Sequence, residues 1–141
     1  MNISFFNEDV KYQLAFARKT RSWLSLVIKE EGKEEGEISY VFCSDDHLLL
    51  LNNMYLNCDY LTDIITFDYC EENVVSGDIF ISIDRVKENA KLYKQPCQQE
   101  MRRVILHGIL HLCGYKDKTE EETQQMREKE NYYLQKFDAI N

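Results

Sequence analysis

The sequence has little proline and glycine, and its cysteines lack the spacing of a zinc-binding or disulfide-bonded scaffold. It contains one proline, Pro96, and five glycines, and it shows no linker, internal repeat or low-complexity segment. The five cysteines are odd in number and form no C-x-x-C pair, which argues against a disulfide framework and a four-cysteine zinc site. We therefore expect reduced and mostly buried thiols at Cys43, Cys58, Cys70, Cys97 and Cys113.

Long hydrophobic runs are also absent, and none reaches the length of a membrane-spanning helix. The first residues carry the acidic Glu8 and Asp9 and have no basic segment, so they do not resemble a secretory signal peptide. These two absences predict a cytoplasmic protein that has no membrane partner.

Positive charge is scarce overall, because the net charge is -8 at pH 7. This balance argues against a general nucleic-acid coat, and we expect no DNA partner. The charges are nevertheless segregated, with acids concentrated in residues 30–37 and 120–122. Residues 85–103 form a basic stretch that could bind RNA phosphates; its cations are Arg85, Lys87, Lys91, Lys94, Arg102 and Arg103.

The hydrophobic pattern predicts one α+β domain over residues 1–141. We expect about four strands in one mixed sheet, packed by about five helices. The predicted strands cover residues 3–6, 38–43, 63–69 and 78–83. The first helix follows a cap at Asn7 or Asp9 and extends past Val27. The other predicted helices cover residues 45–53, 84–93, 97–113 and 119–137.

Local signals mark the ends of several of these elements. Gly32 and Gly36 predict a turn, and residues 57–60 read as a polar turn. Ser44 or Asp45 can cap the second helix. Thr119, followed by Glu122, is typical of a capping box at the start of the final helix.

The chemistry is concentrated in the helix predicted over residues 97–113. His107 and His111 are four residues apart and therefore share one helical face. The rest of this helix is apolar nearly all round, which is typical of a buried helix. Two imidazoles on a buried helix both need a polar partner, because an unpaired buried polar group costs about 1–3 kcal/mol. A shared zinc-type ion would satisfy both.

A third ligand is available just beyond this helix. Gly114 ends the helix and lets the chain turn back, so the carboxylate of Asp117 could reach the same ion. The order is then H-x3-H-x5-D, which leaves one metal position open for water. The alternative is that His107 and His111 are core histidines bonded to backbone or carboxylate groups. His47, the remaining histidine, is interpreted as structural or solvated.

The residue after the first histidine argues against one class of enzyme. Metalloproteases of the H-E-x-x-H type carry a glutamate there as general base, and this sequence has Gly108. The identity of a proton acceptor stays open, because a metal ion itself can make a water molecule acidic near neutral pH.

Three segments together resemble the YbeY endoribonucleases. Residues 107–115 read HGILHLCGY, close to the family signature HGxLHLxGY. The second segment, LNNMY at 51–55 followed by LTDIITF at 61–67, resembles the family's LNxxYR…PTDVLSF, and the third, GDI at 77–79, matches a family strand. Met126 and Glu130 also fall where the family's last helix carries Met and Glu.

The resemblance implies a small α+β fold, one zinc ion per chain and hydrolysis of single-stranded RNA. It further implies a role in ribosomal RNA maturation and ribosome quality control, with the ribosome or its proteins as partners. His107 and His111 match the first two family ligands. The family's third ligand is a histidine, so Asp117 is an inferred substitution.

A second departure is Leu56, where the family usually carries an arginine that can contact phosphate. Either another cation replaces that arginine, with Arg102 and Arg103 as candidates, or the activity is weaker. Glu100 shares the metal-facing side of the helix and could orient an imidazole. Asp63 and Asp78 are interpreted as structural residues at the starts of strands.

Two alternative functions remain at this point. One is a ribosome-associated binding protein whose zinc is mainly structural, which Leu56 and Asp117 keep open. The other is a metallohydrolase of another substrate such as peptide, which Gly108 disfavours. Three protein ligands with an open position would support catalysis, because structural zinc sites have four protein ligands.

Overall fold

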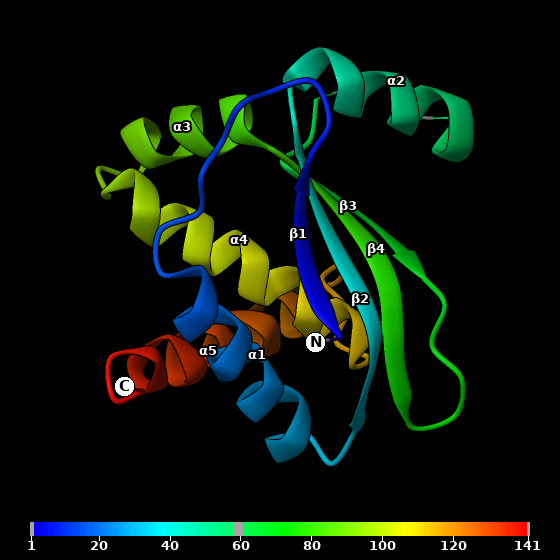
Figure 1. Ribbon diagram of the computed structural model, residues 1–141, viewed down its shortest axis with the longest axis vertical. Coiled ribbons are helices and arrows are strands. Elements are labelled where there is room, and N and C mark those ends of the chain that lie inside the picture. Colours follow the sequence, from blue (N-terminus) through cyan, green and yellow to red (C-terminus); the bar gives the residue numbers. More distant parts are fainter. Residues whose placement is uncertain (1, 58–60, 141) are drawn as a thin grey trace.

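The computed structural model describes residues 2–57 and 61–140, which fold around one mixed four-stranded sheet (Figure 1). The strands are β1 (Ile3–Asn7), β2 (Glu34–Cys43), β3 (Ile64–Asp68) and β4 (Val74–Ser82). Their order is β1-β2-β4-β3, with β3 antiparallel to β4 and the other pairs parallel. Five helices complete the described residues: α1 (Ala17–Glu30), α2 (Asp45–Leu56), α3 (Ile83–Leu92), α4 (Cys97–Leu112) and α5 (Glu120–Phe137). The predicted α+β class and mixed sheet are confirmed.

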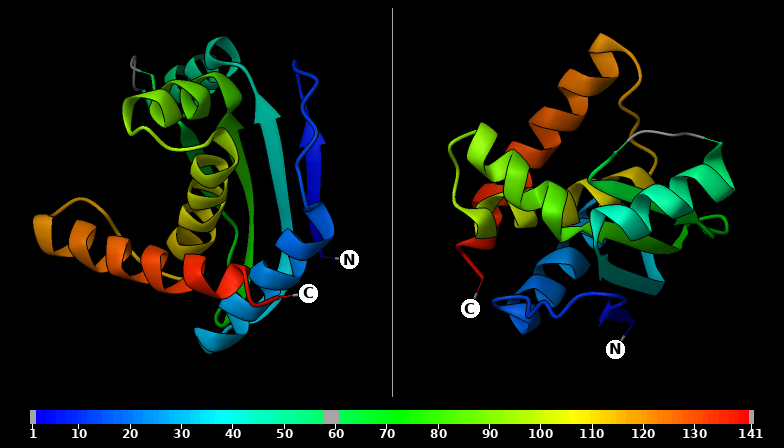
Figure 2. Two further views of the ribbon diagram at one scale, coloured as in Figure 1. Left: turned by 90° about the vertical axis from the view of Figure 1, so that its left-hand side faces the viewer. Right: turned by 90° about the horizontal axis from the view of Figure 1, so that it is seen from above.

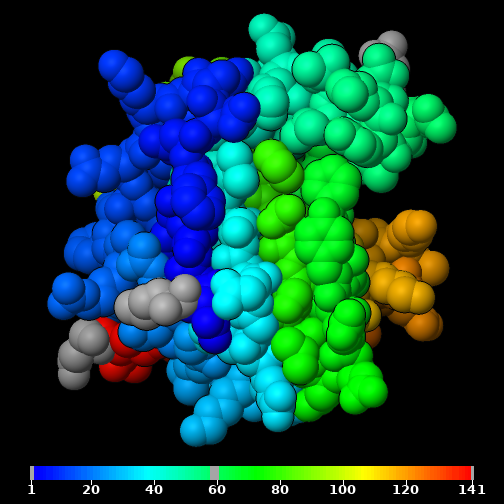
Figure 3. Space-filling model, turned by 45° about the vertical axis from the view of Figure 1, so that its right-hand side comes forward, coloured from blue at the N-terminus to red at the C-terminus, as the bar shows by residue number. Residues whose placement is uncertain are grey.

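The helices α1, α3, α4 and α5 lie on one side of the sheet, whereas α2 sits at its end (Figure 2). On the opposite side, the side chains of the four strands form the surface of the molecule (Figure 3). The sequence of β4 follows this division, because its residues alternate between partly exposed and buried positions. One face of the sheet is therefore covered by helices, and the other is covered only at one end, where Leu48 of α2 packs against Ile65 of β3 and Phe80 of β4.

Helix α4 lies against the covered face and forms the centre of the core. Ile105 and Ile109 of α4 and Ile79 and Ile81 of β4 are all fully buried. The hydroxyl of Tyr40 on β2 donates to the Ile105 carbonyl oxygen at 2.7 Å. This contact adds a directional bond to the apolar packing, so the helix that carries both histidines is held firmly against the sheet.

Helix α5 crosses the molecule and packs on α1 and α4 (Figure 2). The buried indole Nε1 of Trp23 on α1 donates to the carbonyl oxygen of Tyr133 on α5 at 2.8 Å. At the start of α5, the Thr119 side chain and the Glu122 side chain satisfy each other's backbone N–H groups. The predicted capping box is confirmed.

The first helix begins later than a cap at Asn7 or Asp9 would place it, so that prediction was wrong. Phe16, in the left-handed conformation at φ 58°, precedes α1 and provides no side-chain cap. The Asp9 carboxylate instead accepts the backbone N–H of Ser44 at 2.9 Å and the Ser44 hydroxyl. Ser44 is the N-cap of α2, accepting from the His47 N–H, as one of the two predicted capping residues.

Two predicted turns have different outcomes. Gly32 has φ +75° and lies in the turn before β2, as expected. Gly36 lies inside β2, which begins before Ile38 and contains a register irregularity between Glu35 and Ile38. The polar turn predicted over 57–60 begins at Asn57, the left-handed C-cap of α2. Cys58, Asp59 and Tyr60 lie outside the described residues.

No helix among the described residues is long and apolar enough to cross a membrane. The four described cysteines are free, but they differ in exposure. Cys43 is buried, and its burial raises the pKa of the thiol to about 12. Cys70 and Cys113 are only partly buried and Cys97 is exposed at the start of α4, so the expectation of mostly buried thiols was wrong for the described cysteines.

Gly77 allows β4 to approach its neighbours closely, and we expect Gly77→Ala to destabilise the fold. An added Cβ would lie 2.5 Å from the Phe67 carbonyl oxygen and 3.1 Å from a Leu112 methyl carbon. Overpacking of this kind costs about 1–3 kcal/mol, measurable as a lower urea midpoint. Gly32→Asn is the matched control, because nothing lies within 4 Å there and asparagine tolerates left-handed φ. Equal midpoints for both variants would contradict the packing argument.

Candidate metal centre

The buried helix α4 presents His107 and His111 from one face. Their ring centroids are 4.7 Å apart and the ring planes are inclined by 76°. The side chains are 20% and 27% exposed, although their helix is buried on its other sides. The four-residue spacing therefore places both imidazoles side by side on one solvent-accessible face of the helix, as predicted.

Asp117 reaches the same spot after the chain reverses. Gly114 adopts φ +112°, and the Tyr115 N–H donates to the Leu110 carbonyl oxygen at 3.0 Å, which closes the end of α4. The Oδ2 atom of Asp117 lies 3.2 Å from His107 Nε2 and 3.4 Å from His111 Nε2. The structure thus brings together the three residues that the sequence pattern selected.

These three side chains form a cluster that could hold a metal ion. Their potential ligand atoms all lie within 4.8 Å of one another. Two imidazole nitrogens and one carboxylate oxygen are an appropriate donor set for zinc or a similar divalent ion. The cluster is the one such group of three or more ligating side chains found in the described part of the chain.

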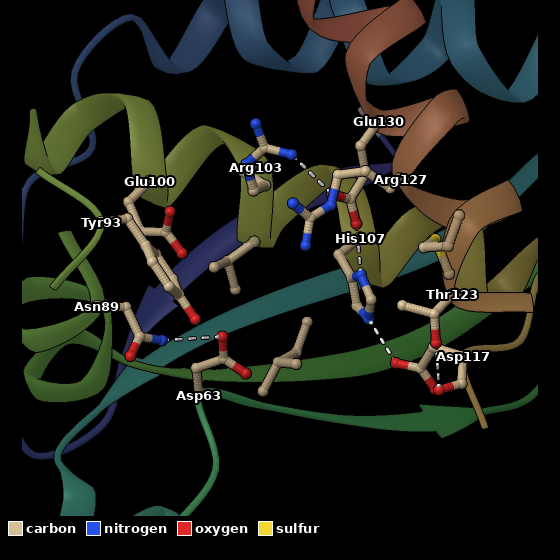
Figure 4. Close-up of a pocket in the computed structure, with 13 residues that line it drawn as sticks. Asp63, Asn89, Tyr93, Glu100, Arg103, His107, Asp117, Thr123, Arg127 and Glu130 are labelled. Atoms are coloured by element: carbon tan, nitrogen blue, oxygen red, sulfur yellow. Dashed lines mark hydrogen bonds and ion pairs between the residues drawn. The ribbon is translucent and has the colours of Figure 1, made fainter. Parts of the chain in front are cut away.

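Glu130 on α5 orients the first of the two imidazoles. Its Oε2 atom lies 2.7 Å from His107 Nδ1, and its Oε1 accepts Arg103 Nη1 at 2.9 Å (Figure 4). The Glu130 side chain is only 5% exposed. A proton on Nδ1 that donates to this carboxylate leaves the Nε2 lone pair directed at Asp117, the tautomer that a metal ligand requires.

The sequence pattern assigned this orienting role to the wrong glutamate. Glu100 lies on α4 and lines the same pocket, but His107 Nδ1 is bonded to Glu130. Burial raises the pKa of Glu100. Glu130 could have been found from the sequence, because it falls where the resembling family carries a glutamate in its last helix. Helical spacing on α4 alone could not reveal a partner from another helix.

The metal cluster opens into a cavity of about 280 Å³ between α3, α4, α5 and the start of β3. Asp63 forms part of its wall and accepts a hydrogen bond from Asn89 Nδ2 at 3.4 Å. Burial raises the pKa of this carboxyl. Asp78 instead lies within β4, opposite Ser39 and Phe67 in the sheet, and does not line the cavity.

Gly108 has a steric role that the sequence did not reveal. A Cβ at this position would lie 3.0 Å from Ile79 Cγ2 and 3.1 Å from Ile64 Cδ1. A larger residue at this position would therefore press on the side chains of Ile79 and Ile64, which would have to shift by a few tenths of an ångström. This crowding disfavours a glutamate general base of the metalloprotease type at this position.

The other candidates lie in distinct surroundings. Arg103 is paired with Glu130, whereas the Arg102 guanidinium stacks 3.8 Å from the centre of the Phe137 ring. His47 is in the first turn of α2 with its ring near Phe80, away from the metal cluster. Leu56 is the last residue of α2 and is 49% exposed.

Comparison with known proteins agrees with these observations. The family model described as Endoribonuclease YbeY matches residues 2–138. The chain belongs to the endoribonuclease YbeY family. A relative named Endoribonuclease YbeY from Cytophaga hutchinsonii is 51% identical over 133 residues, covering 94% of this chain and 93% of that protein. Another of that name, from Phocaeicola vulgatus, is 50% identical and covers 94% of this chain and 96% of its own.

The fold also resembles a solved structure. The solution structure of a protein from Thermotoga maritima superposes with a TM-score of 0.69 at 28% sequence identity. The match covers 96% of this chain and 88% of that one. The YbeY resemblance drawn from three sequence segments is therefore confirmed over nearly the whole length of the chain.

In this YbeY family member the two histidines have opposite pKa shifts. Burial lowers the pKa of His107, but the hydrogen bond to Glu130 and nearby carboxylates outweigh it, so the net shift is upward. Burial, together with the charge of His107, lowers the pKa of His111. The contact with Glu130 is therefore the main electrostatic difference between the two imidazoles.

We expect His107 to remain protonated to a higher pH than His111 in the metal-free protein. Imidazole NMR signals followed across pH, with a chelator present, give both titrations. In Glu130→Gln the pKa of His107 should fall, because the negative charge next to Nδ1 is removed. If His111 instead had the higher pKa of the two, Glu130 would not determine which imidazole of the cluster holds its proton longer.

Proposed function

We propose that this chain is a metal-dependent endoribonuclease that hydrolyses phosphodiester bonds in single-stranded RNA. Its proposed setting is the cytoplasm, in ribosomal RNA maturation and ribosome quality control, with the ribosome or its proteins as partners. Membership of the YbeY family supports the class of reaction. The observation that carries the proposal is the convergence of His107, His111 and Asp117 in one cluster, of which His107 and Asp117 line the adjoining cavity.

Zinc is the proposed ion, held by His107 Nε2, His111 and Asp117. The orientation of His107 by Glu130 fits a metal ligand, because ligating imidazoles usually donate their other N–H to a carboxylate or carbonyl group. When bound, zinc would supply a Lewis acid that polarises a phosphate oxygen and makes a water molecule acidic near neutral pH. The metallohydrolase domain is proposed to comprise residues 1–141.

Residues around the proposed ligands orient one of them for metal binding. Glu130 fixes the ring of His107, and Arg103 holds Glu130 in turn. Arg103 therefore acts as a positioning residue and is not a free substitute for the arginine that the family carries at the position of Leu56. The cavity beside the cluster gives an unpaired RNA segment access to the metal ligands.

The alternative functions receive less support. A structural zinc would need four protein ligands, and the described residues provide a cluster of three. A peptidase of the H-E-x-x-H type would need a glutamate after the first histidine; this chain has Gly108 there, and the close approach of Ile79 and Ile64 disfavours a larger residue. A catalytic site with one open metal position agrees best with the arrangement.

The proposal predicts that metal content and RNA cleavage are lost together. We expect His111→Ala and Asp117→Asn to lower zinc per chain, because each removes or weakens a ligand. Asp117→His should retain zinc, and it should move the rising limb of the pH–rate profile to lower pH, since it removes a negative charge.

Elemental analysis gives the metal content, and cleavage is measured on a ribosomal RNA fragment that contains unpaired segments. A fully paired RNA of the same sequence is the substrate control. Wild-type metal content and cleavage in Asp117→Asn would exclude Asp117 as a ligand. A metal-loaded wild-type protein that leaves the unpaired RNA intact would contradict the proposed activity.

Glu130→Gln should weaken metal binding even though Glu130 is not a ligand. Loss of a carboxylate partner of a ligating histidine typically lowers metal affinity about 10–100-fold. Glu128→Gln is the matched control, because it removes the same charge from the same helix at an exposed position. Within the described residues, the side chain of Glu128 accepts a hydrogen bond only from Gln124. Metal competition titrations compare the two variants. Equal affinities would limit Glu130 to a structural role.

A further inference from the structure

A second pocket, of about 360 Å³, adjoins the metal pocket. The two pockets share the side chains of Tyr93, Glu100, Arg103 and Arg127. The second pocket extends from these shared residues towards the end of α5, where Asp138 lines it. An extended ligand in the metal pocket could therefore continue into the second pocket without leaving the surface.

Arg127 is the cation best placed to bind a ligand at the junction. Its side chain is 64% exposed, and its Nε is 3.8 Å from Glu130 Oε1, an atom that already accepts Arg103 at 2.9 Å. No side-chain hydrogen bond of Arg127 occurs within the described residues. In Figure 4, Arg103 and Arg127 lie together beside His107. A guanidinium with unused donors is well suited to a phosphate.

The remaining walls are suited to a nucleobase more than to a simple anion. Tyr93 is 58% exposed as a residue and lines both pockets, so a base could stack on its ring. The amides of Gln95 and Gln99 offer donors and acceptors for a base edge. Asp138 adds an acceptor that would repel a bare anion but could accept a base N–H.

We propose that the second pocket is a nucleotide subsite of the RNA-cleaving site, so the inference rests on the proposed function. Arg127 binds the phosphate of a nucleotide next to the cleaved bond, and Tyr93 stacks on the base of that nucleotide. A base can enter the pocket only when it is unpaired, which gives the enzyme a physical reason to select single-stranded segments. Arg127 also provides the phosphate contact that Leu56 cannot.

Binding measurements with the full chain test this assignment. A short labelled single-stranded RNA is titrated with each protein in the presence of a chelator, so that the RNA stays intact. We expect Tyr93→Leu to weaken binding about tenfold through lost stacking, and Tyr93→Phe to retain wild-type affinity. Arg127→Gln should weaken binding and reduce the slope of log K against log salt by about 0.7, the contribution of one phosphate contact.

Arg18→Gln is the matched control, because Arg18 is exposed on α1 and lines neither pocket. It changes the same charge and should leave both affinity and salt slope unchanged. Circular dichroism checks that all variants are folded, as expected for exposed side chains.

Wild-type affinity and salt slope in both Tyr93→Leu and Arg127→Gln would overturn the subsite. Equal losses in Arg18→Gln and Arg127→Gln would also overturn it, because they would indicate only a general charge effect. The proposed function is judged separately, by cleavage with the metal-loaded wild-type protein. Cleavage by the wild type with no change in binding for the variants rejects the subsite alone. Altered binding by the variants without wild-type cleavage rejects the nuclease activity alone.

Discussion

The geometry of the candidate metal centre depends on one buried carboxylate that joins two helices. Glu130 on α5 accepts His107 Nδ1 through one oxygen and Arg103 Nη1 through the other. Both partners lie on α4, so this single group fixes α5 against α4 and selects the tautomer of a ligand at the same time. A hydrogen bond between charged groups in a buried position is stronger than one at the surface. One contact therefore aligns the cluster and also contributes to the docking of α5, which Trp23 holds from the other side through the Tyr133 carbonyl oxygen.

Much of the fold followed from local patterns in the sequence. The apolar circumference of α4, the glycine at its end and the capping box of α5 predicted these elements nearly at their observed bounds. Predictions failed where distant residues decide the local structure. Asp9 could cap a helix by its residue type, but it bonds Ser44 far along the chain. Gly36 reads as a turn residue, yet it lies inside a strand, at an irregularity flanked on both sides by residues that pair with β4.

The residues of the candidate site also fall into those that local patterns identify and those that only tertiary contacts identify. His107, His111 and Asp117 could be selected from the sequence because helical spacing and a glycine reversal are local rules. The role of Glu130 could not be derived from them, since it requires knowledge of how α5 crosses α4. The packing reason for Gly108 likewise depends on Ile79 and Ile64 from the sheet. Contacts between elements, more than residue types, account for what the sequence left undetermined.

The indole N–H of Trp23 on α1 donates a hydrogen bond to the backbone of α5. This bond connects the first helix of the described chain to the last. Helix α5 is synthesised after the helix that carries both histidines, so a growing polypeptide exposes the two imidazoles before Glu130 exists to orient them. The oriented cluster forms only when α5 has docked on both α1 and α4. Completion of the tertiary structure is thus needed before Glu130 can orient His107, so the order of the cluster is a property of the whole fold and not of α4 alone.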